Sequence, residues 1–80
     1  MRDTTFTVFE GVSYDNRHGG PFDRGSADSW YDRPVNPHYY VGGTGTSELV
    51  EMMAMSKEET SAYLAGYAYN EEFGGKKSWD

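Results

Sequence analysis

Residues 21–40, PFDRGSADSWYDRPVNPHYY, decide how the rest of this chain is expected to fold. Phe22, Ser26 and Trp30 recur at intervals of four residues, and side chains with that spacing gather on one face of a helix. The stretch therefore predicts a helix from Asp23 to Asp32 that carries an aromatic face. The aspartate at its start is a candidate N-cap.

The end of this helix is expected at Arg33, because Pro34 disfavours the helical conformation in the residue before it. Residues 35–37 (Val-Asn-Pro) then indicate an extended or turned connector, and residues 38–40 (His-Tyr-Tyr) the start of a short strand. Gly25 lies inside the helix, where glycine lowers stability. It therefore indicates either a weak helix or the close approach of another backbone.

The composition bounds what the chain can be. It has 80 residues, no cysteine and a formal net charge of −6 at pH 7, which excludes disulfides and disfavours unaided binding to nucleic acids or anionic membranes. Aromatic residues make up 16% of the chain and aliphatic residues are scarce, so rings are expected to form most of the core. No run approaches the roughly 20 apolar residues of a membrane span and no signal peptide is recognisable, which indicates a soluble, cytoplasmic protein.

Two further segments have the character of strands. Asp3–Val12 is rich in Thr, Phe and Val and is the best candidate, followed by residues 13–20 (SYDNRHGG) with the composition of a loop. Glu48–Met53 is the second candidate, although its charges and methionines also fit a helix. The glycine-rich run before it, residues 42–47, lacks the Lys-Ser/Thr ending of a phosphate loop, so a hairpin or mobile loop is expected.

A second helix is expected to begin after Ser56. Ser56 and Glu59 have the spacing of a capping box, in which each side chain binds the backbone N–H of the other residue. Gly66 lies inside this helix, where it costs about 1 kcal/mol relative to alanine. This cost indicates close contact with another element, and Trp30 or Tyr31 is the expected partner.

The fold class that follows is a small α+β domain over residues 1–80. It is expected to contain an N-terminal strand, an aromatic helix, one or two further short strands, and a longer C-terminal helix. That helix is predicted to end at Gly74-Gly75, with Lys76-Lys77 placed favourably near its negative end. The side chains expected to join the two helices are Trp30, Tyr31, Leu64 and Tyr67.

Two segments resemble a family of small phage and prophage proteins. The first, FDRGSADSWYDRPVNPHYY, contains an Arg-Gly-x-x-Asp helix with two adjacent aromatics and an Arg-Pro-x-x-Pro-His link. The second, MSKEETSAYLAGYAYNEEFGGKKSW, contains a Tyr-x-x-Gly-Tyr-x-x-Asn-Glu helix that ends in Lys-x-Trp. Residues 21–80 follow the pattern of the family, whereas residues 1–20 look like an addition. The resemblance implies a phage origin and conveys no enzymatic activity.

More distantly, the two short helices with Gly-aromatic motifs resemble the ribosome modulation factor, which is basic and binds ribosomal RNA. This likeness implies a ribosome-associated modulator as an alternative role. The present chain is acidic, and its charge disfavours the same mode of RNA binding.

One group of candidate site residues is basic. Arg24 and Arg33 could bind a carboxylate or a phosphate, with His38 as a proton carrier. The alternative is structural: Arg24 and Asp28 have the spacing of a helical ion pair, and His38 could cap or hydrogen-bond a turn. The structural alternative is favoured, because the sequence places no nucleophile or anion-binding glycine loop beside these residues. A metal site lacks a known ligand spacing, so no metal or cofactor is expected from Asp15, His18, Asp23 and His38.

Acidic and aromatic side chains supply the second group, a candidate surface for a partner. One set, together with Asp3, Glu10 and Asp15, could mimic the phosphates of a nucleic acid and occupy a basic groove: Glu48, Glu51, Glu58, Glu59, Glu71 and Glu72. Another set could anchor the partner: Arg24, Trp30, Tyr31, Arg33, His38, Tyr39 and Tyr40. The same residue types are also typical of a solvated face and of an aromatic core.

We therefore expect a non-enzymatic phage protein that binds and inhibits or redirects a host macromolecular complex. Anti-defence action against a CRISPR or restriction complex is the sharpest version. The partner is expected to be a host protein or ribonucleoprotein with a basic surface, approached by electrostatic steering in the bacterial cytoplasm. Direct contact with nucleic acid or membrane is not expected. A small enzyme is the least favoured alternative.

Overall fold

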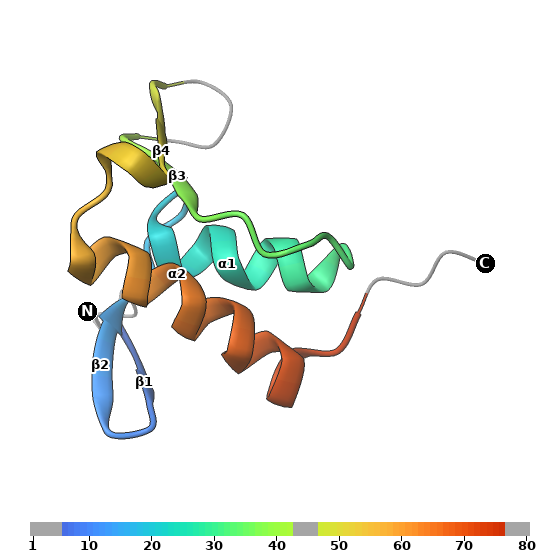
Figure 1. Ribbon diagram of the computed structural model, residues 1–80. Coiled ribbons are helices and arrows are strands. Elements are labelled where there is room, and N and C mark those ends of the chain that lie inside the picture. The colour runs from blue at the N-terminus through green and yellow to red at the C-terminus, as the bar shows by residue number, and fades with distance from the viewer. Residues whose placement is uncertain (1–5, 43–46, 77–80) are drawn as a thin grey trace.

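The computed structural model describes residues 6–42 and 47–76. The two helices pack against each other, and two small antiparallel sheets lie below and above them in the view of Figure 1. This arrangement confirms the predicted small α+β fold. In chain order the elements are β1 (Phe6–Phe9), β2 (Val12–Asp15), α1 (Pro21–Trp30), β3 (His38–Tyr40), β4 (Leu49–Glu51), the 3₁₀ turn η1 (Met52–Ala54), α2 (Lys57–Tyr69) and the π-turn η2 (Asn70–Gly74).

The first sheet is a tight hairpin that the sequence did not predict. Phe9 pairs with Val12, so only Glu10 and Gly11 connect the strands, and both have positive φ angles, of 52° and 80°. A two-residue turn with positive φ angles suits the twist of a hairpin. A strand in the predicted segment is confirmed by β1, but its continuation to Val12 and the loop after it were wrong, because the chain reverses at this turn and β2 runs on to Asp15. The first residues of the predicted strand lie outside the described residues.

Helix α1 begins earlier than predicted. Gly20 is its N-cap, and Pro21 takes the first helical position, where an N–H group would have no intrahelical partner. Asp23 was therefore wrongly predicted as the N-cap and lies inside the first turn. Its carboxylate accepts a hydrogen bond at 2.9 Å from the backbone N–H of Gly19 and steadies the turn before the helix. The helix ends at Trp30, slightly before the predicted end.

The two helices cross at a pair of glycines. A Cβ atom on Gly25 would lie 2.0 Å from the carbonyl oxygen of Tyr63, and one on Gly66 would lie 2.1 Å from the carbonyl oxygen of Phe22. Real Cβ atoms essentially never come within 3.0 Å of such a neighbour, so only glycine permits the two backbones to approach this closely. The predicted close approach at both glycines is confirmed.

The large side chains expected at this crossing lie elsewhere. Trp30, Tyr31 and Leu64 are 40%, 38% and 45% exposed, so the prediction that these side chains join the helices was wrong. The contact at Gly66 is made by the backbone of α1 and not by a ring. Because the glycines bring the backbones together, there is no room for a large side chain between them. Tyr63 is fully buried beside the crossing.

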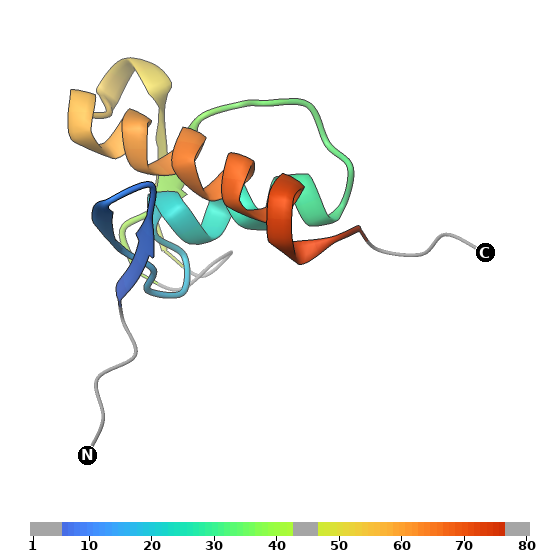
Figure 2. The same ribbon diagram turned by 90° about the horizontal axis from the view of Figure 1, so that it is seen from below.

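The core is aromatic, as predicted. Among the described residues the buried apolar side chains are Phe9, Phe22 and Tyr63. Phe22 lies between Tyr14 and Tyr69, with ring centroids 5.5 and 5.6 Å apart, and Phe9 meets Tyr69 edge-on at 5.7 Å. These ring contacts hold the β1–β2 hairpin against both helices. Figure 2 shows the hairpin and the helices from the side on which the hairpin lies.

The second hairpin and the start of α2 follow the predictions. β3 and β4 pair antiparallel with Tyr39 opposite Val50, so the glycine-rich run joins the strands of a hairpin, although residues 43–46 lie outside the described residues. Ser56 Oγ accepts from the Glu59 N–H at 3.1 Å, and the Glu59 carboxylate accepts from the Ser56 N–H at 2.8 Å. The predicted capping box is thus confirmed.

Candidate functional site

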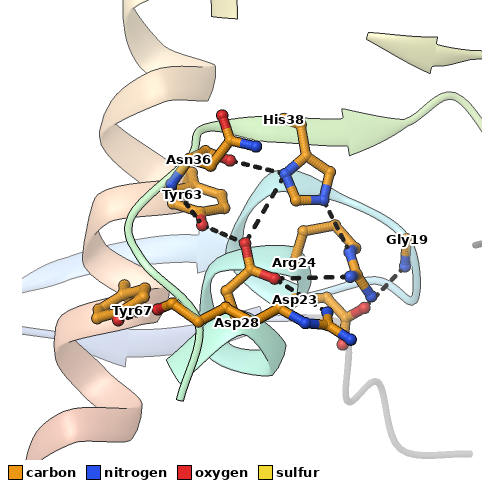
Figure 3. A network of polar contacts seen from close by, with 9 residues as sticks. Gly19, Asp23, Arg24, Asp28, Asn36, His38, Tyr63 and Tyr67 are labelled. Carbon is orange, nitrogen blue, oxygen red and sulfur yellow. Dashed lines mark hydrogen bonds and ion pairs between the residues drawn. The ribbon is translucent and has the colours of Figure 1, made fainter. Parts of the chain in front are cut away.

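A buried carboxylate on α1 collects the polar side chains that the sequence had grouped (Figure 3). Asp28 is 3% exposed, and its Oδ1 lies 3.3 Å from Arg33 Nη1 and 3.8 Å from Arg24 Nη2. Tyr63 donates its hydroxyl to Oδ2, and His38 Nδ1 lies 3.8 Å from the same oxygen. The predicted ion pair on the helix is confirmed, and the three basic candidates converge on one centre. We call these five residues the Asp28 network.

The hydrogen bonds of His38 define its tautomer. Arg24 Nε can only donate, and it lies 3.2 Å from His38 Nε2, so that ring nitrogen is the acceptor. The ring proton is therefore on Nδ1, which donates to the carbonyl oxygen of Asn36 at 2.7 Å. This pattern requires a neutral imidazole with both nitrogens in use. His38 thus hydrogen-bonds the connector before β3, but the predicted turn is wrong, because residues 33–37 form no turn.

Two tyrosines on α2 tie the connector between α1 and β3 to the helices. The Tyr63 hydroxyl donates to Asp28 and accepts from the Asn36 backbone N–H at 3.1 Å. Burial, together with the bond to Asp28, raises the pKa of Tyr63 above its ordinary value, so the hydroxyl keeps its proton. Tyr67 donates to the carbonyl oxygen of Arg33. These bonds give the network a structural role, because they fix the path of the connector into β3.

The Asp28 network also borders an open pocket. We call it the Arg24 pocket; its volume is about 320 Å³, and its lining residues are Arg24, Asp28, Arg33, Pro34, Asn36, His38 and Tyr40. The Arg24 guanidinium lies 5.8 Å from the centroid of the Tyr40 ring, and the Arg33 guanidinium lies 4.8 Å from that of Tyr31. Two cations and one carboxylate therefore meet at this pocket.

Tyr39 borders a second pocket on the opposite face of β3, since successive side chains of a strand alternate between its faces. We call it the Tyr39 pocket; its volume is about 330 Å³, and its lining residues are Ser13, Tyr14, Asp15, Arg17, Pro21, Tyr39, Glu58, Glu59 and Ala62. Strand β2 contributes the residues from 13 to 15, and the first turns of α2 contribute the glutamates. Asp15 was grouped with these glutamates in the predicted acidic set, and it lines the same pocket from β2, a segment that was predicted as a loop.

Arg17 is the basic residue among those that line the Tyr39 pocket, and its guanidinium binds the backbone of the second hairpin. Nη2 donates to the carbonyl oxygen of Tyr40 at 2.8 Å, and Nη1 donates to that of Gly42 at 3.3 Å. The backbone N–H of Arg17 also donates to Asp15 Oδ1 at 2.9 Å. The guanidinium thereby holds the end of β3, and the carboxylates that line the pocket outnumber it.

The carboxylates of Glu58 and Glu59 differ in the hydrogen bonds that they accept. Glu59 accepts the Tyr39 hydroxyl at 2.9 Å as well as the Ser56 N–H. The Ser56 N–H lowers the pKa of Glu59, and the bond to Glu59 raises the pKa of Tyr39, so this pair is a carboxylate and a protonated hydroxyl. Glu58 is exposed, and no side-chain bond to it is found within the described residues. An incoming cation would therefore meet one fixed and one available carboxylate on α2.

The glutamates predicted to bind a partner do not form one continuous face. Glu48 precedes β4, where its backbone carbonyl accepts the Val41 N–H at 3.0 Å, and it is not among the residues that line the Tyr39 pocket. Glu51 pairs with His38 across the β3–β4 sheet and lines a small neighbouring pocket on the other face. Of the six predicted glutamates, the two at the start of α2 line the Tyr39 pocket.

The other two predicted glutamates, Glu71 and Glu72, lie roughly 20 Å further along the helix axis, at about 1.5 Å per residue. Glu71 accepts the Ser29 hydroxyl at 2.6 Å and forms a hydrogen-bonded pair with Lys76, which lowers the pKa of Glu71 and raises that of Lys76. Asn70 donates to the same hydroxyl at 2.9 Å. Glu71 therefore helps to hold η2 against α1.

The predicted aromatic anchors are also divided. Trp30 and Tyr31 lie exposed at the end of α1, where Tyr31 contacts the Arg33 guanidinium. Tyr39 and Tyr40 are half-buried and line different pockets, because they are neighbours on one strand. The structure thus brings one predicted tyrosine to the acidic pocket and another to the basic pocket.

Three of the four residues weighed as metal ligands have other partners, among them Asp15, which accepts the Arg17 N–H. Asp23 binds the turn before α1, and His38 belongs to the Asp28 network. Within residues 6–42 and 47–76, no group of three or more histidines and carboxylates could hold a metal ion. None of the helices in this part of the chain is both long and apolar enough to cross a bilayer.

Comparison of the chain with protein-family models, with curated proteins and with solved structures finds no match. The resemblance to small phage and prophage proteins therefore remains a prediction from the motifs. A function has to be inferred from the two pockets and from the charges around them.

Proposed function

We propose that this protein is a non-enzymatic binding protein that docks through the Tyr39 pocket onto a basic surface of a macromolecular partner. The observation that carries the proposal is the lining of this pocket, in which Tyr14 and Tyr39 lie among the carboxylates of Asp15, Glu58 and Glu59. A lysine or arginine side chain suits such a site, because its charge is attracted by ring faces and its N–H groups by carboxylates.

The overall charge supports the same role at longer range. A net charge of −6 on 80 residues attracts a basic surface and raises the association rate. Because surface charges are screened beyond about 8 Å at physiological ionic strength, this attraction guides the encounter but does not select the docked position. Selection then depends on groups in contact, which the Tyr39 pocket provides.

Exposed apolar side chains in β4 and in the segment between β4 and α2 support a macromolecular partner. Leu49, Met52 and Met53 are 45%, 54% and 100% exposed in the segment that leads from β4 to α2. Methionine adapts its shape to irregular surfaces and is common at binding sites. A partner docked at the start of α2 could cover these side chains and gain affinity from their burial.

The partner that we propose is a host protein or ribonucleoprotein in the bacterial cytoplasm. Complexes that bind nucleic acid present basic grooves, and a protein that fills such a groove with carboxylates competes with phosphates. Together with the phage resemblance, this makes an anti-defence inhibitor the sharpest form of the proposal. His38 is not proposed as a general base, because its two ring nitrogens are engaged by Arg24 and Asn36.

The test compares two double variants that change the net charge equally. Asp15→Asn with Glu58→Gln removes exposed carboxylates at the Tyr39 pocket, whereas Glu10→Gln with Glu72→Gln removes exposed carboxylates elsewhere. The wild-type chain is used to capture a partner from bacterial lysate at two salt concentrations. Association of that partner with all three proteins is then measured over a range of salt.

The pocket variant is expected to bind about tenfold more weakly, a loss of about 1.4 kcal/mol, with a weaker dependence on salt. The control variant should stay within about twofold of the wild type, because its two lost charges lie outside the pocket and act only through screened, long-range attraction. Equal losses in the two variants would show that net charge alone attracts the partner. No loss in either variant would refute the proposal.

A further inference from the structure

The guanidiniums at the Arg24 pocket have more N–H groups than the described part of the chain uses. A guanidinium carries five N–H donors. Within residues 6–42 and 47–76, the Arg24 guanidinium donates one hydrogen bond, to His38, and the Arg33 guanidinium donates one, to Asp28. The Arg24 side chain is only 13% exposed and lines the pocket. Its remaining donors are thus largely withdrawn from bulk water and need an acceptor.

The pocket also carries an excess of positive charge. Asp28 is a single carboxylate facing two guanidiniums, and His38 is neutral in the hydrogen-bond pattern described above. One positive charge is therefore left uncompensated at this place in a chain of net charge −6. Glu51 lines the adjoining pocket and not the Arg24 pocket itself, and the carboxylate of Asp23, which precedes Arg24 on α1, accepts the Gly19 N–H.

Both guanidiniums are held in place before any ligand arrives. Arg24 lies over the ring of Tyr40 and Arg33 over the ring of Tyr31, at 5.8 and 4.8 Å from the ring centroids. Such contacts favour a fixed orientation of the planar guanidinium. A site whose donors are already oriented binds with a smaller loss of conformational entropy.

We propose that the Arg24 pocket binds a monoanionic carboxylate, such as an acidic side chain or a chain terminus, between the guanidiniums of Arg24 and Arg33. Guanidinium groups match the two oxygens of a carboxylate with paired N–H donors. A single uncompensated positive charge, with Glu51 close by, favours a monoanion over the more highly charged phosphate. Asp28 stays in place as the permanent counter-ion.

The experiment uses the full chain and ¹H–¹⁵N NMR, with acetate, inorganic phosphate and chloride as probes at constant ionic strength. Acetate is expected to shift the Arg24 Nε–H signal and the backbone signals around His38, and to saturate in the millimolar range. Arg33→Gln should weaken acetate binding about tenfold, because it removes one guanidinium with its charge and its paired N–H donors. Lys57→Gln removes an exposed cation outside the pocket and should leave binding unchanged.

Arg33→Lys keeps a positive charge near Asp28 but lacks the planar guanidinium with its paired N–H donors. It therefore provides a second test if the glutamine variant fails to fold. Weaker acetate binding in this variant, with a native spectrum, would support paired N–H donors. The proposal would be overturned if chloride shifted the same signals as strongly as acetate. It would also be overturned if the two Arg33 variants bound acetate as tightly as the wild type does. Tighter binding of phosphate than of acetate would overturn the assignment to a monoanionic carboxylate.

Discussion

Replacing Gly66 by alanine should force the two helices apart. The new Cβ atom would lie 2.1 Å from the carbonyl oxygen of Phe22 and 2.8 Å from its carbonyl carbon, whereas ordinary contact begins at 3.4 Å. Both of these atoms belong to the backbone of α1, which cannot rotate away as a flexible side chain can. A shift of either helix would also disturb the matching contact between Gly25 and the backbone of Tyr63.

Two effects of this substitution oppose each other. Alanine raises helix propensity by about 1 kcal/mol relative to glycine in a helix interior. Overpacking of a tight interior usually costs about 1–3 kcal/mol, and sometimes more. The three atoms nearest to the new Cβ all belong to the backbone of Phe22. We therefore expect a cost at or above the upper end of that range. The net loss should then be about 2 kcal/mol, which lowers the melting temperature of a domain of this size by about 10 °C.

Thermal and urea unfolding, followed by far-ultraviolet circular dichroism, measure this change. Ala68→Gly is the matched control, because Ala68 is exposed on the same helix and its replacement affects propensity alone. It should lower stability by about 1 kcal/mol. A Gly66→Ala protein that melts at the wild-type temperature or above it would show that propensity dominates. The close crossing of the helices would then be refuted.

Two further predictions concern polar contacts. Tyr63→Phe should lower stability by about 1–3 kcal/mol, because the Asp28 carboxylate and the Asn36 N–H both lose a partner. In urea unfolding, Tyr67→Phe should lose less, since its hydroxyl binds one exposed carbonyl, and equal losses would contradict this account. The lowered pKa of Glu59 means that its contribution to stability is fully present above the unfolded value of 4.5 and is lost as the pH falls below it. Glu59→Gln should therefore flatten the decline of urea midpoints on acidification, whereas Glu58→Gln should not, and parallel curves for all three proteins would count against this role.

The segments that were predicted correctly carry strong local signals. The capping box depends on residues only three apart, and the strand at His38–Tyr40 follows a proline-bounded connector. The hairpin at Glu10–Gly11 was missed because glutamate is not a typical residue for a positive φ angle. Its pairing is supported by the contact of Phe9 with Tyr69, a residue far away in the sequence.

In the candidate sites, too, contacts within one helix were predictable and contacts between segments were not. The spacing of Arg24 and Asp28 was enough to predict their ion pair, since both lie on one helix. The convergence of Arg33, His38 and Tyr63 on the same carboxylate depends on the return of the connector across α2. No local pattern encodes this return, because the three residues come from three different segments.

By itself, the sequence determined the aromatic nature of the core and the capped start of the second helix, and it marked two glycines inside helices as sites of close approach. These properties depend on composition or on residues within one turn of each other. Only the tertiary structure decided which rings are buried and which carboxylates gather around Tyr39. It also decided that the two arginines share one buried counter-ion. The physical reason is that burial and charge pairing depend on distances between segments, and these were settled when the helices packed at Gly25 and Gly66.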